Sequence, residues 1–152
     1  MTDLLHYEPI IRLSCFLGVL LAMMGWEWRW PRRTLSLSRA RRWPANLGII
    51  LIDSGVLRWL FPVLAVGMAE LAENRSWGLF HGLNAPFWLA LVATLLLLDL
   101  TIYAQHVAFH KIPLLWRLHR MHHTDLDFDV TTALRFHPLE IALSMLLKLA
   151  VV

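Results

Sequence analysis

The sequence predicts an all-α protein, a polytopic bundle of membrane helices with a histidine-rich cap on its cytoplasmic side. Hydrophobic residues make up 58% of the 152-residue chain and the mean hydropathy is +0.56, whereas soluble domains are roughly 45–50% apolar. These residues are gathered into long runs, which is typical of membrane spans. Six of the eight histidines lie between Asp99 and His137, where the third apolar run ends.

The first predicted span runs from Pro9 to about Trp26, which is just long enough to cross a hydrocarbon core of ~30 Å. Trp26, Trp28 and Trp30 follow as an interfacial aromatic belt. An arginine-rich stretch comes next, with Arg29, Arg32, Arg33, Arg39, Arg41 and Arg42. Between two apolar segments, such a stretch indicates a cytoplasmic loop rather than a nucleic-acid-binding patch.

The second apolar segment extends from Leu47 to about Ala72 and contains Asp53, Arg58 and Pro62. We expect Asp53 and Arg58 to face the bundle interior or a neighbouring helix, because charges are costly in lipid. Pro62 predicts a kink, and a re-entrant hairpin is the alternative for this segment.

A polar turn over residues 73–85 leads into the third span, from Pro86 to Gln105, in which Asp99 is the only charged residue. The last apolar run opens at Pro138, which suits a first helical turn. It still continues at Val152, so we expect the chain to be truncated at its C-terminus.

The histidines fall into two sets whose spacing suits helix faces. His106 and His110 are four residues apart, and His119, His122 and His123 follow at spacings of three and four, on a short helix expected to start at Pro113. Two such faces side by side predict a metal site. Imidazole suits zinc, copper, iron and nickel about equally, so the count does not select the metal.

Two other kinds of metal site are disfavoured. The single Cys15 leaves no cysteine-based zinc site, and Val107 after His106 lacks the glutamate of a zincin protease. The series Asp125, Asp127 and Asp129 does not match an EF-hand, because Val130 and Phe136 occupy the positions of its glycine and glutamate. We expect an acidic loop, with one carboxylate as a candidate to support a metal ligand.

Further polar residues line up with the first histidine set. Asp99 and Tyr103 fall on the same helical stripe as His106 and His110. Asp99 is predicted either to orient a ligand imidazole from outside the metal shell or to pair within the bundle with Asp53 or Arg58 or with another helix. The isolated His6 and His81 are assigned to the surface.

The motifs HVAFH and HRMHH resemble the histidine boxes of the fatty acid hydroxylase / sterol desaturase superfamily. Asp99 and Tyr103 upstream and the run from Arg135 to Glu140, RFHPLE, add to the resemblance, which covers roughly residues 86–152. It implies that His106, His110, His119, His122 and His123 are metal ligands. His137 matches a His-Pro-x-Glu position and is expected to open a helix rather than to bind metal. With Asp99 and Tyr103 it remains a candidate for an additional ligand or for a residue that hydrogen-bonds to a ligand.

The resemblance also implies a function. It indicates a membrane enzyme that uses two non-haem iron ions and O2 to hydroxylate or desaturate a fatty acyl or sterol-like lipid, with zinc as a substitute metal in purified material. A ferredoxin or cytochrome b5-type protein would donate electrons, and the bacterial inner membrane or the endoplasmic reticulum would be the location. Residues 1–85 would form an N-terminal transmembrane region with the arginine-rich loop, and residues 86–152 the start of an incomplete hydroxylase-like domain.

Family members have further histidine boxes beyond the helix that begins here at Pro138. The 152-residue chain is therefore expected to contain part of a site and to be inactive alone. The alternatives are a non-catalytic, truncated membrane metal-binding protein and a membrane haem protein. The latter is disfavoured because axial histidines usually lie at membrane depth on facing helices.

Overall fold

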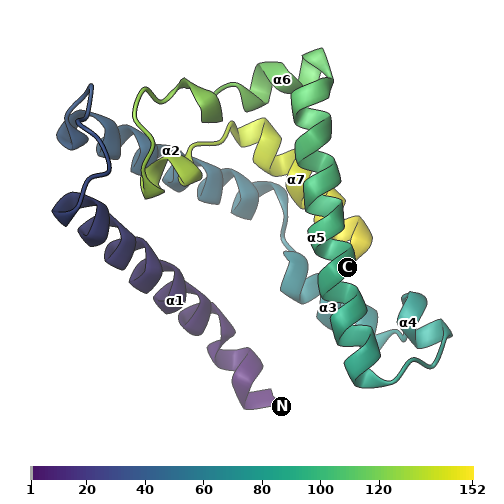
Figure 1. The fold of residues 1–152 in the computed structure, drawn as a ribbon. Coiled ribbons are helices and arrows are strands. Elements are labelled where there is room, and N and C mark those ends of the chain that lie inside the picture. Colours follow the sequence, from purple (N-terminus) through teal and green to yellow (C-terminus); the bar gives the residue numbers. More distant parts are fainter. Residues whose placement is uncertain (1) are drawn as a thin grey trace.

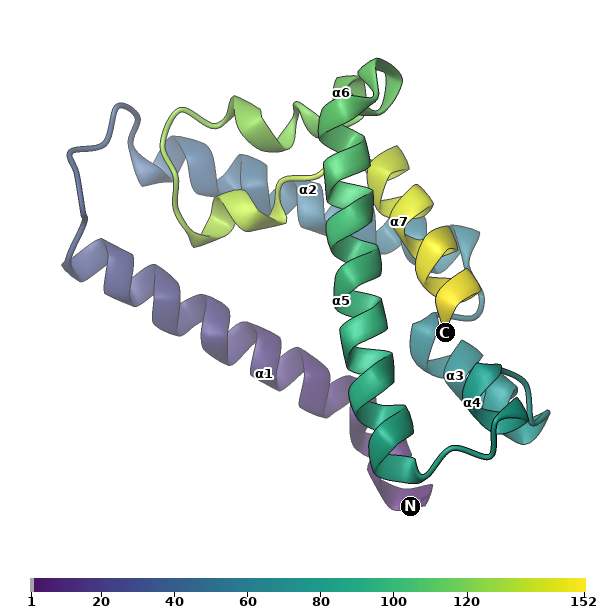
Figure 2. The ribbon, with the colours of Figure 1, turned by 45° about the vertical axis from the view of Figure 1, so that its right-hand side comes forward.

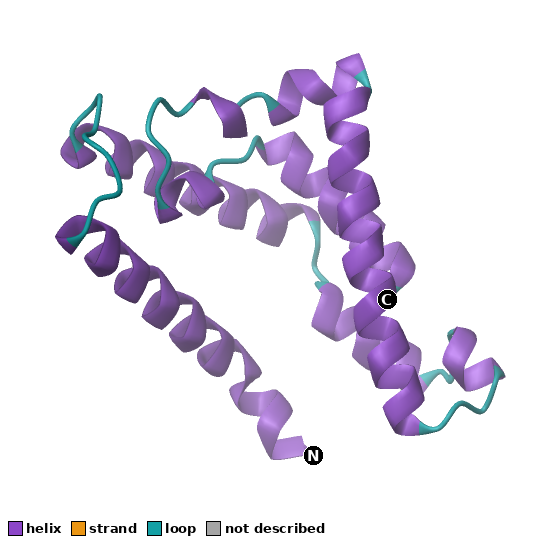
Figure 3. Ribbon diagram, viewed as in Figure 1, coloured by secondary structure: helices purple, strands orange, loops and turns teal. Residues whose placement is uncertain are grey.

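The computed structural model describes residues 2–152, and within them the chain is helical, with no strand (Figure 3). The elements are α1 (Thr2–Arg29), α2 (Arg39–Leu60), α3 (Ala65–Asn74), α4 (Leu79–Gly82), α5 (Phe87–Lys111), α6 (Pro113–His119), the 3-10 turns η1 (His122–Thr124) and η2 (Val130–Leu134), and α7 (Pro138–Val151). The predicted all-α fold is confirmed.

Three segments are long and apolar enough to cross a membrane: His6–Arg29, Arg39–Gly82 and Phe87–Lys111. Almost none of their side chains is buried. Leu20 and Phe109 are the only buried hydrophobic side chains in the described part of the chain. The spans therefore expose apolar surface along most of their length, as membrane helices do.

The elements between and after the long segments connect α1, α2 and α5. Helix α2 packs against α7 and η2, η2 also touches α1, and α6 contacts both α5 and α7. The connection from α6 to α7 runs beside α2 (Figures 1 and 2). Segments from both halves of the sequence thus meet where α5 ends.

The second apolar segment is broken at Pro62 rather than kinked. Helix α2 ends at Leu60 and α3 begins at Ala65. Phe61, directly before the proline, is extended with φ −121° and ψ 97°, which is the conformation that a following proline ring favours. The break is complete because Pro62 also lacks the N–H that would continue the helix.

Helix α2 begins earlier than expected, at Arg39. The arginine-rich stretch is thus divided between a loop over residues 30–38 and the first turn of α2, which contains Arg39, Arg41 and Arg42. Asp53 is buried as expected, whereas Arg58 is exposed, so the interior position predicted for Arg58 is wrong.

The helix predicted to start at Pro113 is confirmed as α6, but it is shorter than expected. It ends at His119, and His122 and His123 lie on the separate turn η1. The expectation that all three histidines share one helix face is therefore wrong, because the chain leaves the α-helix one residue after His119.

Candidate metal centre

The two histidine sets are placed by a sharp reversal between α5 and α6. Ile112 is extended, with φ −92° and ψ 116°, because Pro113 follows it. Pro113 then occupies the first turn of α6, where its missing N–H costs no helical hydrogen bond. His106 and His110 lie on the last turns of α5, and His119 is the last residue of α6.

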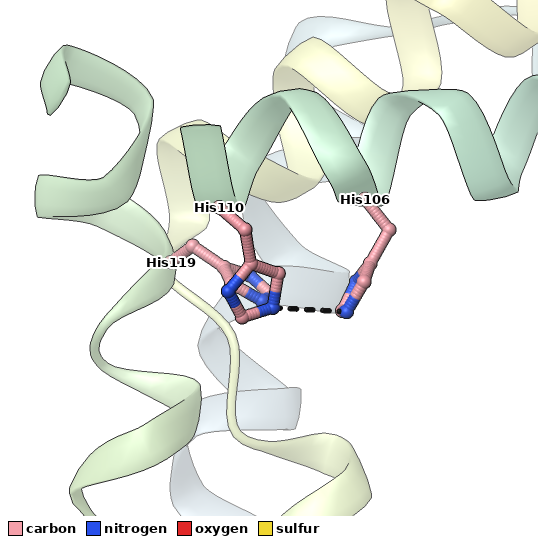
Figure 4. Close-up of side chains that lie close together, drawn as sticks. All are labelled: His106, His110 and His119. Carbon is pink, nitrogen blue, oxygen red and sulfur yellow. Dashed lines mark hydrogen bonds between the residues drawn. The ribbon is translucent and has the colours of Figure 1, made fainter. Parts of the chain in front are cut away.

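The structure brings the five imidazoles together. Nε2 of His110 lies 3.1 Å from Nε2 of His106 (Figure 4). The ring centroid of His119 lies 4.7 Å from that of His106 and 4.8 Å from that of His110. The His123 centroid is 4.9 Å from His110 and 5.1 Å from His119, and the His122 centroid is 5.5 Å from His119.

Three of these residues come close enough for a single ion. One candidate ligand nitrogen from each of His106, His110 and His119 lies within 4.8 Å of the others. His106 and His110 are exposed, whereas His119 is 0% exposed. The group therefore has one side closed by protein and one side open.

His119 has the donor arrangement that a metal-bound imidazole needs. Its Nδ1 lies 2.6 Å from Oε1 of Glu140, while its Nε2 is buried and has no hydrogen-bond partner among the described residues. Burial, together with the neighbouring His106 and His110, lowers the pKa of His119 to about 4. The neutral imidazole donates from Nδ1 and leaves Nε2 with a free lone pair, which fits a metal ion.

Glu140 was not among the predicted site residues. It lies in the first turn of α7, is 4% exposed, and burial raises its pKa to about 7. A buried acid within hydrogen-bond reach of a histidine fixes the orientation and tautomer of the ring. The available signal was that Glu140 is the single acidic residue in the largely apolar run after Pro138.

His122 is fixed by stacking. Its ring is nearly parallel to that of Phe136, at 4° and 4.7 Å between centroids. Its Nδ1 is buried and has no hydrogen-bond partner within residues 2–152. Burial and the neighbouring histidines lower the pKa of both His122 and His123, so these rings also favour the neutral form that binds metals.

The other predicted site residues lie outside this cluster. Asp99 and Tyr103 are exposed on α5, and neither side chain makes a hydrogen bond in the described part of the chain. His137 precedes α7, and its Nδ1 accepts a hydrogen bond of 3.1 Å from the backbone N–H of Leu139. That contact is the helix-opening role expected for it.

The acidic loop is a buried ion-pair network rather than a solvated segment. Arg42, 5% exposed, donates to both carboxylate oxygens of Asp125 at 2.7 and 2.8 Å and to Asp129 at 2.9 Å. It also donates to the backbone oxygen of Asp127. The Asp127 carboxylate accepts from the backbone N–H groups of Ser36 and Leu37 at 2.9 and 2.8 Å. None of the three carboxylates contacts a histidine, so the network joins the loop over residues 30–38 and α2 to the histidine-bearing segment.

A cavity of about 700 Å³ lies away from the histidines. Its lining comes from the end of α1, the loop after it, the first residue of α2 and the acidic loop, and includes Trp26, Trp30, Arg32, Arg33 and Arg39. None of the five clustered histidines lines it. The candidate metal centre is therefore the open histidine cluster and not this cavity.

Fold and site together define a helical membrane protein with an all-histidine cluster where one of its spans ends. The fatty acid hydroxylase family model matches residues 91–152, the segment that contains all five histidines and Glu140. This match confirms the resemblance inferred from the histidine motifs.

Two relatives illustrate the match. The fatty acid hydroxylase vlmA of Lecanicillium sp is 49% identical over 81 residues, which cover 47% of this chain and 22% of that protein. The alkylglycerol monooxygenase of Xenopus tropicalis is 26% identical over 139 residues, which cover 88% of this chain and 28% of that protein. The chain thus spans about a quarter of the length of these curated relatives. No solved structure matches it significantly.

Proposed function

We propose that this chain supplies the first histidine boxes of an O2-dependent membrane lipid hydroxylase or desaturase with a histidine-ligated di-iron centre. The observation that carries the proposal is the convergence of five imidazoles around His119. Its buried Nε2 has no hydrogen-bond partner within residues 2–152, and its Nδ1 is fixed by Glu140. His106, His110, His119, His122 and His123 would be the ligands. The names of the two relatives, a fatty acid hydroxylase and an alkylglycerol monooxygenase, support the lipid class.

Iron at this cluster would supply the activation of O2 that oxidation of an unactivated C–H bond requires. The protein contributes imidazoles, a carboxylate that orients one of them, and a position at the end of a membrane span. An acyl or sterol-like substrate would approach from the bilayer along the exposed apolar surface of α5. Hydroxylation consumes one O2, two electrons and two protons, and releases one water.

The electrons require an external donor, for which we propose a ferredoxin or cytochrome b5-type protein. The arginines between α1 and α2, together with Lys111, Arg117, Arg120 and Arg135, put basic residues at the same end as the histidines. By the positive-inside rule this end is cytoplasmic, in a bacterial inner membrane or the endoplasmic reticulum. An acidic donor would meet the basic face there.

The test begins with metal content. The chain would be purified in detergent from iron-supplemented cells, and iron and zinc per chain measured beside a variant in which His106 and His110 are both alanine. We expect iron in the parent chain and its loss in the variant. A chain that retains no metal would overturn the proposal.

The second arm tests the reaction in membranes from cells that express the full open reading frame. These would be supplied with a ferredoxin, its reductase, NADPH and ¹⁸O2, and the lipids analysed by mass spectrometry. An ¹⁸O-labelled hydroxyl or a new double bond that depends on O2 supports the proposal. One zinc per chain without an O2-dependent product would instead establish the alternative, a non-catalytic membrane metal-binding protein.

A further inference from the structure

One arginine outside the turn that contains His122 and His123 holds this turn in place through hydrogen bonds. Arg135 donates from Nε to the backbone oxygen of Met121 at 3.0 Å and from a terminal nitrogen to Thr124 Oγ1 at 3.1 Å. Its guanidinium therefore bonds to the residues on both sides of the two histidines. A planar guanidinium that makes several bonds at once restricts position and orientation together.

The arginine is itself fixed by a buried amide on α2. Its third nitrogen donates to Oδ1 of Asn46 at 3.0 Å. Asn46 is 0% exposed, and its Nδ2 donates to Asp125 Oδ2 and to Thr131 Oγ1, each at 3.0 Å. The oxygen and the nitrogen of the Asn46 amide thus both make hydrogen bonds, and through this amide helix α2 fixes the position of the Arg135 guanidinium.

The turn has few other restraints. Its backbone bonds are short-range, from His123 N–H to the Arg120 oxygen at 3.0 Å and from Thr124 N–H to the Met121 oxygen at 3.4 Å. A 3-10 turn of three residues has poor hydrogen-bond geometry. His123 is exposed. His122 has ring contacts to Phe136, His119 and Phe128, but its buried Nδ1 makes no hydrogen bond within the described residues. The position of these two imidazoles therefore depends on the bonds made by Arg135.

We propose that Arg135 and Asn46 are positioning residues that set His122 and His123 against His106, His110 and His119. This inference rests on the proposed metal centre and adds to it a residue outside the family-matched segment, since Asn46 precedes residue 91. His106, His110 and His119 are placed independently, by the α5–α6 reversal and by Glu140. Loss of Arg135 should therefore weaken only the part of the centre that His122 and His123 complete.

The experiment is a cobalt titration of the purified, metal-stripped full chain in detergent. Co²⁺ stands in for iron, and its visible absorption changes with the number and geometry of bound imidazoles. Arg135→Gln removes the guanidinium. Arg120→Gln is the matched control, because Arg120 is exposed, flanks the same turn and makes no side-chain hydrogen bond within the described residues.

We expect the parent and Arg120→Gln to bind Co²⁺ in two phases with the same spectrum. In Arg135→Gln the weaker phase should lose affinity by about tenfold or more, as supporting contacts of metal ligands typically do, while the tighter phase is kept. Asn46→Ala should shift the same phase. Arg135→Lys, which keeps the charge without the planar fork, should recover only part of the loss.

The outcomes separate the two proposals. If the parent binds no Co²⁺, the metal centre itself is refuted. If the parent binds Co²⁺ and Arg135→Gln gives the same affinities and spectrum, the positioning role is refuted. Should Arg135→Gln fail to fold by circular dichroism, Arg135→Lys and Thr124→Val decide, because each removes only part of the contact; parental cobalt binding in both would overturn the inference.

Discussion

Two polar clusters involve the chain between α6 and α7, and they differ in how far their hydrogen bonds are satisfied. In the network around Arg42, the guanidinium meets the Asp125 and Asp129 carboxylates and the Asp127 backbone oxygen. In the histidine cluster, Nε2 of His119 and Nδ1 of His122 are buried without a partner among the described residues. Satisfied groups stabilise a fold, whereas buried unpaired ones are costly and point to a ligand.

The difference follows from chemistry. Arginine and aspartate are complementary as donor and acceptor, so they saturate each other. Five imidazoles are alike, and a neutral imidazole has one acceptor nitrogen that like neighbours can satisfy only in part. Removing a residue from the first cluster should therefore reduce stability, and removing one from the second should reduce metal binding.

The largest effect is expected for His119→Ala. The ring is at the centre of the cluster and is the one that Glu140 orients, so its removal should abolish tight metal binding while the helix content is kept. Metal per purified chain and circular dichroism measure the two. His81→Ala, at an exposed histidine far from the cluster in sequence, should leave the metal content unchanged. If His119→Ala retained metal, the histidine cluster could not be distinguished from the Arg42 network by a role in metal binding.

Arg42→Gln should reduce stability rather than metal binding at the tight site. Removing one partner leaves buried carboxylates uncompensated, a change that typically costs about 3–5 kcal/mol. Thermal unfolding of the detergent-solubilised chain would report it as a large fall in Tm. Arg41→Gln provides the comparison, because Arg41 is adjacent and exposed, and surface substitutions usually change stability by about 0.5 kcal/mol or less. Equal Tm values for the two variants would show that the network is not a structural element.

Glu140→Gln should have an intermediate effect that sharpens the comparison. The amide preserves size but is a weaker acceptor for Nδ1–H of His119, so metal affinity should fall by about 10–100-fold. A competition titration with a metal chelator measures the shift. Glu70→Gln, at an exposed acid on α3, should bind metal as the parent does. An unchanged affinity in Glu140→Gln would mean that the short contact to His119 has no influence on the ligand.

The smallest expected effect is a loss of stability at low pH. Hydrogen bonds from Arg42 hold the pKa of Asp125 below its ordinary value of 3.8. Below pH 3.8 the unfolded chain therefore binds more protons than the folded chain, and stability falls as the pH is lowered further. Tm measured from pH 6 to pH 2.5 should drop at the acid end. Asp125→Asn should start lower and show a shallower drop, and an identical slope would contradict the assignment.

The membrane spans and the convergence of the histidines could be predicted because each depends on local pattern. An apolar run near 20 residues defines a span, and the spacing of His106 and His110 defines a face. The end of α6 at His119 was missed because the histidine spacing fits one continuous helix, and the structure instead continues in a 3-10 turn. The partners of Arg42, Asn46 and Glu140 could not be predicted, because each is 21 to 89 residues away in sequence.

Because α1, α2 and α5 have almost no apolar packing against one another, their tilt should depend on the thickness of the surrounding bilayer. At ~1.5 Å per residue, the 25 residues of α5 extend well beyond a hydrocarbon core of ~30 Å, and such excess length is commonly absorbed by tilting. Each span is free to tilt with little resistance from the others, while ion pairs and turns keep the imidazoles together. Lipids of different chain length should then change the slant of the spans and leave the spacing of the imidazole nitrogens the same.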